Sequence, residues 1–283
     1  MRKILSLIKL WLKEFGETLV SFLRVILFAS ASTARKVTKI RERSQLGEHK
    51  CVILGNGPSL KEAIINMELD EGDYFAVNLF VLSEDFWTLK PIAYFLVDPY
   101  IFYSMEERAI SQRKVLVDAF LKVDWSMMLI VPQMLKMELI SEILNNKNIN
   151  VIKVNSNDFI GYKPICHWFY RYNLAMVPCQ TVLNAALMFA LNLGYKEISL
   201  YGADHTWTKD LIVNDDNEVC YGDRHVYKTN VEYSKLSYNM GTILDNFSKM
   251  FKSHYLIREY ADYMGVKIIN KTIGSFVDAY ERK

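Results

Sequence analysis

From about residue 50 onward, short runs of hydrophobic residues alternate with segments of helical periodicity. Short apolar runs bounded by turn residues are typical of buried strands, and apolar residues three and four apart predict helices. The expected strands cover residues 51–54, 74–78, 92–99, 127–131, 151–154, 198–202 and 266–269. The expected helices cover residues 60–68, 104–121, 133–145, 181–193 and 253–264. This alternation predicts an α/β fold, a Rossmann-like parallel sheet with helices on both faces.

Two segments break the alternation. Residues 155–177 are rich in aromatic residues without clean periodicity, which favours a long connection anchored in the core. Residues 208–246 are polar and rich in tyrosine, and they follow a strand end. A long insertion at that place is typical of a lid over a ligand site, expected over about 205–246.

The amino-terminal segment has a different pattern. Apolar residues between positions 3 and 29 are interrupted by charges such as Lys9, Lys13 and Arg24. No uninterrupted run approaches the ~18 residues of a spanning helix, and charges inside the apolar region argue against a cleaved signal peptide. The pattern favours an amphipathic helix in a membrane interface, followed by basic residues at 35, 36, 39, 41 and 43 that attract anionic headgroups. A helix packed on the body or on a second subunit is the alternative.

These patterns divide the chain into a membrane-associating helix with a basic linker, residues 1–48, and an α/β domain, residues 49–283. The chain has 283 residues, 51% of them hydrophobic, so global disorder is excluded. A net charge of +2 gives no reason to expect a nucleic-acid partner. The four cysteines lack metal-ligand spacing and suggest no disulfide framework, which favours the cytoplasm. The expected location is therefore peripheral, on the inner face of the cell membrane.

The first strand runs directly into the turn Gly55-Asn56-Gly57-Pro58-Ser59. Glycines permit a sharp turn and a close approach, and free amides at a following helix would attract phosphate. No Gly-Lys-Ser/Thr follows and the third dinucleotide-type glycine is missing, so neither common nucleotide motif is present. The turn is a candidate nucleotide-phosphate site, and an ordinary strand-to-helix turn is the alternative. Asn78 and Asp98 fall at the ends of the next strands, where ligands bind in open parallel sheets.

The turn with Leu60 resembles the nucleotide-binding turn of bacterial sialyltransferases of glycosyltransferase family forty-two and of the related motility-accessory-factor family. The segment 192–204, Asn-Leu-Gly-Tyr-Lys-Glu-Ile-Ser-Leu-Tyr-Gly-Ala-Asp, is similar to a second sialyltransferase motif. The two motifs occur in the family's order, and the resemblance covers about residues 50–278.

The resemblance implies an inverting glycosyltransferase that moves sialic acid or a related keto-sugar acid from a CMP-sugar donor to a surface or lipid-linked glycan. No cofactor is required, although a divalent cation is left open, and no protein-bound metal is expected. A homo-oligomer is also left open. The expected nucleotide-binding residues are Gly55, Asn56, Gly57, Pro58, Ser59, Asn78, Asp98, Thr181, Gly202, Asp204 and Thr206. Thr206 stands where the family has a tyrosine, and Tyr221 and Tyr227 are the nearest tyrosines of the lid.

Such a transfer needs a general base for the acceptor hydroxyl, and histidine suits this role near neutral pH. His225 in the lid, beside Arg224 and Tyr227, is the preferred candidate. His254, near the start of the expected helix 253–264, and His205, next to Asp204, are the others.

Two other classes compete with this interpretation. A pterin diphosphokinase-like enzyme is one, because a related family shares the Gly-Asn-Gly-Pro-Ser turn. It would transfer diphosphate from ATP and use magnesium, for which Asp98 and Asp204 are candidate ligands. A non-catalytic nucleotide-binding protein is the other, and its histidines would be dispensable.

Overall fold

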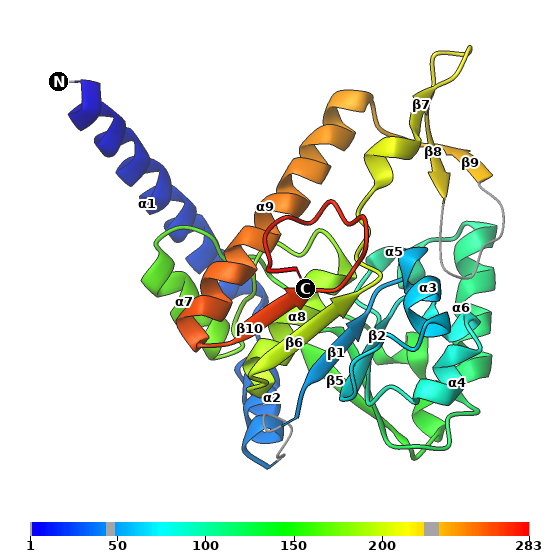
Figure 1. The fold of residues 1–283 in the computed structure, drawn as a ribbon. Helices are drawn as coiled ribbons and strands as arrows, with labels where there is room; N and C mark the ends of the chain where they lie inside the picture. The colour runs from blue at the N-terminus through cyan, green and yellow to red at the C-terminus, as the bar shows by residue number, and fades with distance from the viewer. Residues whose placement is uncertain (1, 44–48, 224–231, 283) are drawn as a thin grey trace.

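A seven-stranded parallel sheet forms the centre of the molecule (Figure 1). The structure is a computed structural model that describes residues 2–43, 49–223 and 232–282. The strand order is β10-β6-β1-β2-β3-β4-β5. The strands are β1 (Cys51–Leu54), β2 (Asp73–Val77), β3 (Ala93–Phe95), β4 (Met127–Pro132), β5 (Ile149–Val154), β6 (Glu197–Tyr201) and β10 (Lys267–Asn270). The predicted parallel α/β fold is confirmed.

Helices cover both faces of this sheet because its strands carry apolar side chains on both sides. In β1, Val52 and Leu54 belong to one core cluster, whereas Cys51 and Ile53 belong to the other. The Val52 side packs against α3 (Ser59–Ile65), α4 (Asp85–Leu89), α5 (Pro99–Tyr103) and α6 (Glu107–Phe120). The Ile53 side packs against α2 (Ala31–Arg43), α7 (Lys163–Arg171), α8 (Val182–Leu193) and α9 (Met240–Met264). Strands buried on both faces are typical of parallel sheets.

Helix α8 is buried along its whole length and contacts the sheet on one side and α2, α7 and α9 on the other. Gly194, in the left-handed region at φ 96°, ends it, as the sequence predicts. Because its first turn lies at the carboxyl ends of the central strands, α8 brings Thr181 to the site described below.

Three predicted elements differ from the observed ones. Residues 133–145 form two short 3₁₀ turns, Met137–Ile140 and Ile143–Asn145, because their buried side chains are too unevenly spaced to make a helical stripe. The aromatic segment 155–177 contains helix α7. Helix α9 begins at Met240, well before the predicted start at residue 253. The Asn239 side chain caps this helix by accepting a hydrogen bond from the Thr242 amide at 2.9 Å.

The amino-terminal segment forms two helices, α1 (Arg2–Phe28) and α2, bent by 91° at the intervening break. The predicted basic linker is thus helical, and α2 buries Thr33, Ala34 and Val37 against α8 and β5. Among the described residues no single helix is long and apolar enough to cross a membrane. In the same described part of the chain, one pair of helices, α1 and α2 taken together, reaches that length and composition.

Helix α1 projects from the body at its amino-terminal end, whereas its later turns lie along the segment that precedes α7 (Figure 1). The Thr18 hydroxyl accepts a hydrogen bond from the Tyr162 amide at 2.9 Å, and the Ser21 hydroxyl accepts one from the Ile160 amide at 3.0 Å. The rings of Phe22 and Phe169 meet edge to face. These contacts fix the direction in which α1 leaves the domain.

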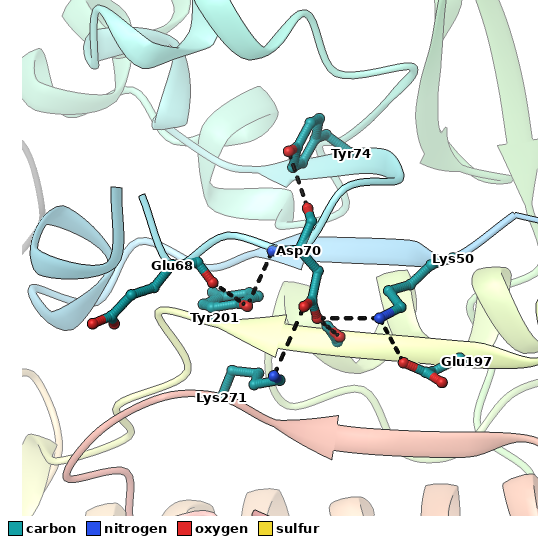
Figure 2. Close-up of polar contacts among 8 residues, drawn as sticks. Lys50, Glu68, Asp70, Tyr74, Glu197, Tyr201 and Lys271 are labelled. Carbon is teal, nitrogen blue, oxygen red and sulfur yellow. Dashed lines mark hydrogen bonds and ion pairs between the residues drawn. The ribbon is translucent and has the colours of Figure 1, made fainter. Parts of the chain in front are cut away.

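The loop between α3 and β2 is fastened to β6 by a polar cluster around Asp70 (Figure 2). The Tyr201 hydroxyl accepts a hydrogen bond from the Asp70 amide at 3.2 Å and donates one to the Glu68 carbonyl at 2.8 Å. The Asp70 carboxylate lies 3.7 Å from the Lys50 ammonium and 3.8 Å from that of Lys271. The cluster therefore holds the end of β6 in place immediately before Gly202.

A small antiparallel sheet stands at the edge of the domain, where the sequence predicts a lid. It contains β7 (Leu211–Val213), β8 (Val219–Asp223) and β9 (Glu232–Lys235). Arg224, His225 and Tyr227 lie outside the described residues. The last part of the predicted lid, from Met240, is the first turns of α9.

Candidate functional site

The order in which the chain adds strands to the sheet reverses at β1. A cleft lies at this point. The chain proceeds from β1 to β5 on one side and then returns to place β6 on the other side of β1. Ligands of open α/β sheets bind at such a switch point, outside the carboxyl ends of the strands. The residues that line the cleft are 56–58 after β1, Val77 at the end of β2, Asn78 directly after it, 181–183 at the start of α8, Gly202 and 204–207 after β6, Asp210 and Tyr221.

The ends of β1 and β6 approach each other so closely that the residue after each strand, Gly55 and Gly202, must be glycine. The Gly55 amide donates to the Tyr201 carbonyl at 2.8 Å, and the Gly57 amide donates to the Gly202 carbonyl at 2.9 Å. A Cβ atom on Gly55 would lie 2.4 Å from the Gly202 carbonyl oxygen, a distance that no real contact allows. Gly202 itself has φ 64°, which favours glycine. The glycines of both sequence motifs therefore serve the contact between the two strand ends.

The carboxylate of Asp204, which follows β6, lies at the amino terminus of α3. At this terminus the sequence predicts free amides that would bind a phosphate. Oδ2 of Asp204 accepts a hydrogen bond from the Ser59 hydroxyl at 2.7 Å, and its Oδ1 accepts one from the Ser59 amide at 3.3 Å. The next two amides donate to the carbonyls of Gly57 and Pro58. The expectation of free amides at this helix is therefore wrong, because a carboxylate of the protein takes the place of the anion. Burial raises the pKa of Asp204, and the hydrogen bonds from Ser59 oppose this rise.

Asn78 contributes an acceptor to the cleft. Its backbone is left-handed, with φ 50°, and its amide donates to the Phe95 carbonyl at 3.1 Å. The side-chain oxygen is buried and has no hydrogen-bond partner among the described residues. Buried polar atoms usually have a partner, so this oxygen suits an N–H or O–H group of a ligand better than a phosphate oxygen.

Two buried histidines meet beside the cleft. His205 lines it, and its Nε2 lies 3.1 Å from Nε2 of His254, whose Nδ1 lies 2.9 Å from the Tyr280 hydroxyl. Burial lowers the pKa of His254 to about 4. Burial, together with the neighbouring His254, holds the pKa of His205 well below its ordinary value of 6.5. Both imidazoles are therefore neutral near pH 7 and joined in one hydrogen-bonded chain.

An aromatic hollow adjoins the cleft between the small sheet and α9. It shares Thr181, Trp207 and Tyr221 with the cleft and extends to Tyr238 and Phe247. The rings of His205 and Trp207 stack with centroids 4.7 Å apart, and those of Trp207 and Phe247 stack at 5.8 Å. A planar or carbohydrate ring could lie against these aromatic side chains.

Most of the predicted nucleotide-binding residues meet in this cleft. Gly55 and Ser59 lie directly behind it, in contact with Gly202 and Asp204. Asp98 does not line it, because its Oδ1 caps α5 by accepting a hydrogen bond from the Tyr100 amide at 2.9 Å. The predicted residues that line the cleft are Asn56, Gly57, Pro58, Asn78, Thr181, Gly202, Asp204 and Thr206.

The three histidines predicted as candidate bases differ in their position relative to the cleft. His205 lines the cleft, His254 lies one layer deeper, and His225 lies outside the described residues. The ring of His167 packs against those of Tyr260 and Tyr263, away from the cleft residues. Trp207 and Asp210 were not predicted, although both follow the strand end within a few residues of Asp204. Their position after the Gly-Ala-Asp motif is the signal that could have identified them.

Acidic side chains are few at the site. Asp204 and Asp210 are the carboxylates among its described lining residues, and Asp98 does not join them. Within the described ranges, no three His, Cys, Asp or Glu side chains gather closely enough to hold a metal ion. A magnesium ion here would therefore depend on oxygens of a bound substrate for most of its ligands.

A family model for 6-hydroxymethylpterin diphosphokinase MptE-like proteins matches residues 27–210, well over half of the chain. The match includes α2, the Gly55–Ser59 turn and the cleft residues after β6, and it ends before β7 and α9. The family is related to the motility accessory factors, which are glycosyltransferase-like. A search of curated proteins found no match.

Proposed function

We propose a nucleotide-dependent transferase function for this chain, which belongs to the MptE-like family. The cleft between β1 and β6 would hold the nucleotide donor, and the adjoining aromatic hollow would hold the group to be modified. In the finer form of the proposal, the donor is a CMP-linked sialic acid or related keto-sugar acid, and the acceptor is a surface or lipid-linked glycan. The observation that carries this form is a neutral histidine lining the cleft, backed by a second buried histidine.

In this mechanism His205 is the general base. The tautomer with Nε2–H donating to Nε2 of His254 leaves Nδ1 of His205 as the proton acceptor. Nδ1–H of His254 then donates to the Tyr280 oxygen, so both ring nitrogens of His254 have a partner. His254 is thus a positioning residue, because it fixes the tautomer of His205 and shares the charge that forms on it.

The reaction itself is a single displacement. The acceptor hydroxyl oxygen attacks the anomeric carbon while its proton passes to Nδ1 of His205. The bond from that carbon to the phosphate oxygen breaks, and CMP leaves with the electron pair. The hydroxyls of Thr206 and Tyr221, which line the cleft, are the candidate donors to the departing phosphate, whereas the Thr181 hydroxyl donates to Asn184 Oδ1 at 3.0 Å.

The proposal includes attachment to the inner face of the cell membrane through α1. Six of the eight residues from 5 to 12 are large, apolar and exposed, including Leu7, Trp11 and Leu12. Since successive helical residues point about 100° apart, these apolar residues cover more than half of the helix surface, and Ser6 and Lys9 lie together on the remaining side. A bilayer interface would cover such a surface and would bring a lipid-linked acceptor near the domain.

A second candidate function is favoured by the family match. It is transfer of diphosphate from ATP to a 6-hydroxymethylpterin, whose planar ring suits the hollow with Trp207 and Phe247. Asp204 and Asp210 would hold magnesium together with the substrate phosphates. The amphipathic α1 has no evident use in a reaction between two soluble substrates.

A ligand panel separates these functions. Thermal unfolding of the full chain would be followed with CMP, CMP-sialic acid, ATP with magnesium, and 6-hydroxymethylpterin. A ligand at a hundred times its dissociation constant stabilises by about 2.7 kcal/mol, which is readily measured. We expect stabilisation by CMP and its sugar, and release of CMP when a glycan acceptor is added. Stabilisation only by ATP and pterin, with pterin diphosphate formed, would replace the first function by the second. Nucleotide binding without any turnover would indicate a non-catalytic protein.

A further inference from the structure

A groove lies beside the bend between α1 and α2, away from the cleft. Arg35, Thr38 and Lys39 of α2 form one wall, and Trp168 of α7 and Tyr172, directly after α7, form the other. Arg35 and Lys39 are four residues apart and therefore share one face of their helix. Trp168 and Tyr172 are 51% and 52% exposed, although their ring centroids lie only 4.9 Å apart. The groove thus places exposed aromatic rings beside exposed cations.

We propose that this groove binds the phosphate headgroup of an anionic lipid while α1 lies in the same bilayer. The inference rests on the membrane attachment in the proposed function and adds a defined headgroup site to it. Tryptophan and tyrosine favour the boundary between hydrocarbon and water because each has an apolar ring and a polar group. Arg35 and Lys39 provide the donors and the positive charge that a lipid phosphate requires.

The position of the groove supports a lipid as its occupant. Helix α1 ends at Phe28, and the groove begins at Ala31, just beyond the break. On the other wall, Phe169 contacts Phe22 of α1, while its neighbour Trp168 points into the groove. The apolar surface of α1 therefore continues directly into the aromatic wall.

Charge also favours an anionic occupant. Within the described part of the chain, Arg35 and Lys39 form no ion pair, and α2 carries three further basic residues, Lys36, Arg41 and Arg43. Glu42 is the one acidic residue among the described lining residues of the groove. The apolar residues among positions 5–12 cover a wide arc of α1, which one neighbouring helix would leave partly exposed, whereas a bilayer interface covers it and leaves the side with Lys9 in water.

The test compares two lysines of the same helix. Lys39 lines the groove, whereas Lys36 is also exposed on α2 but lies outside the groove. Binding of the full chain would be measured by co-sedimentation with phosphatidylcholine vesicles and with vesicles containing one quarter phosphatidylglycerol. We expect Lys39→Gln to weaken binding to the anionic vesicles about fivefold, and Lys36→Gln to weaken it less than twofold. Trp168→Ala should weaken binding to the same vesicles, and neither lysine variant should change binding to phosphatidylcholine alone.

The outcomes separate this inference from the attachment on which it rests. Equal losses in Lys36→Gln and Lys39→Gln would overturn the groove and leave a diffuse attraction, with attachment by α1 intact. If the unaltered chain binds neither vesicle, both attachment and groove are wrong. Oligomers that form through α1 without vesicle binding would assign the surface to a second copy instead.

Discussion

The carboxylate of Asp204 and the hydroxyl of Ser59 join the two strand ends that form the cleft, at a distance of 2.7 Å from Oδ2 to Oγ. The contact links the two motifs that are most distinctive in the sequence. It also gives Gly57 a structural role, because the absence of a side chain at this residue makes room for the Asp204 carboxylate. A Cβ atom on Gly57 would lie 1.8 Å from Oδ2 of Asp204 and 2.7 Å from the Gly202 carbonyl oxygen.

We therefore expect Gly57→Ala to destabilise the fold and not only to weaken ligand binding. Relief of the clash requires Asp204 to move and strains the backbone at Gly202, which should lower the free energy of unfolding by about 1–3 kcal/mol. Urea denaturation followed by circular dichroism measures the change. Gly16→Ala is the matched control, because nothing lies within 4 Å of its added Cβ. Equal stability of the two variants would contradict the close approach.

The buried histidines predict acid sensitivity of the fold. In the unfolded chain His254 takes up a proton near pH 6.5, whereas in the folded chain its pKa is about 4. Between these values the unfolded state binds more protons, so stability falls as the pH decreases from 6.5 toward 4. At pH 5 the loss from His254 amounts to about 2 kcal/mol, and His205 adds to it in the same direction.

His254→Gln tests this effect, since its amide can still both donate and accept a hydrogen bond. The variant should lose less stability between pH 7.5 and pH 5 than the unaltered chain, by about 2 kcal/mol. Urea titrations at the two pH values provide the comparison. The same acid loss in both proteins would mean that another group is responsible.

Turnover should identify the base among the three candidate histidines. We expect His205→Ala to lower kcat by roughly two to four orders of magnitude, with nucleotide affinity little changed. His254→Ala should shift the acid limb of the kcat/KM profile as well as lower kcat, because it acts through His205. In the unaltered enzyme that limb should lie below pH 6.5, since burial lowers the pKa of His205.

The His225→Ala variant tests His225, the base that the sequence favours. Loss of turnover in His225→Ala, with His205→Ala near normal, would assign the base to His225 and leave the buried pair a structural role. Full activity in all three variants would exclude a histidine base and direct attention to Asp204 or Asp210.

Two truncations should separate α1 from α2. Removal of residues 1–13 eliminates mainly exposed apolar side chains, so the body should keep its stability while vesicle binding falls. Removal of residues 1–35 also deletes Thr33 and Ala34, which are buried against the body, and should lower the melting temperature. Circular dichroism melts of the two proteins make the comparison. Unchanged melting of the longer truncation would show that the first turn of α2, with Thr33 and Ala34, contributes nothing to the stability of the body.

The central fold could be predicted because buried parallel strands give short, continuous apolar runs. The buried residues of helix α7, Cys166, Phe169 and Tyr170, have helical spacing, but the exposed Ile165 and Trp168 between and beside them obscure this stripe in the sequence. The start of α9 was missed because residues 240–252 carry only scattered buried side chains, such as Ile243 and Met250.

The strand-end rule placed Asn78, Gly202 and Asp204 in the cleft. It failed for Asp98, which follows a strand farther from the switch point and caps its own helix. Contacts between distant residues, such as those of His205 with His254 and of Asp204 with Ser59, leave no local signal in the sequence.

The Ser59–Asp204 contact joins positions 145 residues apart, across the pairing of β1 with β6. Closing so long a loop is entropically costly and slows folding, whereas β1 to β5 can associate through much shorter connections. During refolding, the half of the sheet from β1 to β5 can therefore assemble before β6 inserts beside β1. A chain caught at that stage would have most of its sheet but no cleft. Recovery of ligand binding should then lag behind recovery of secondary structure.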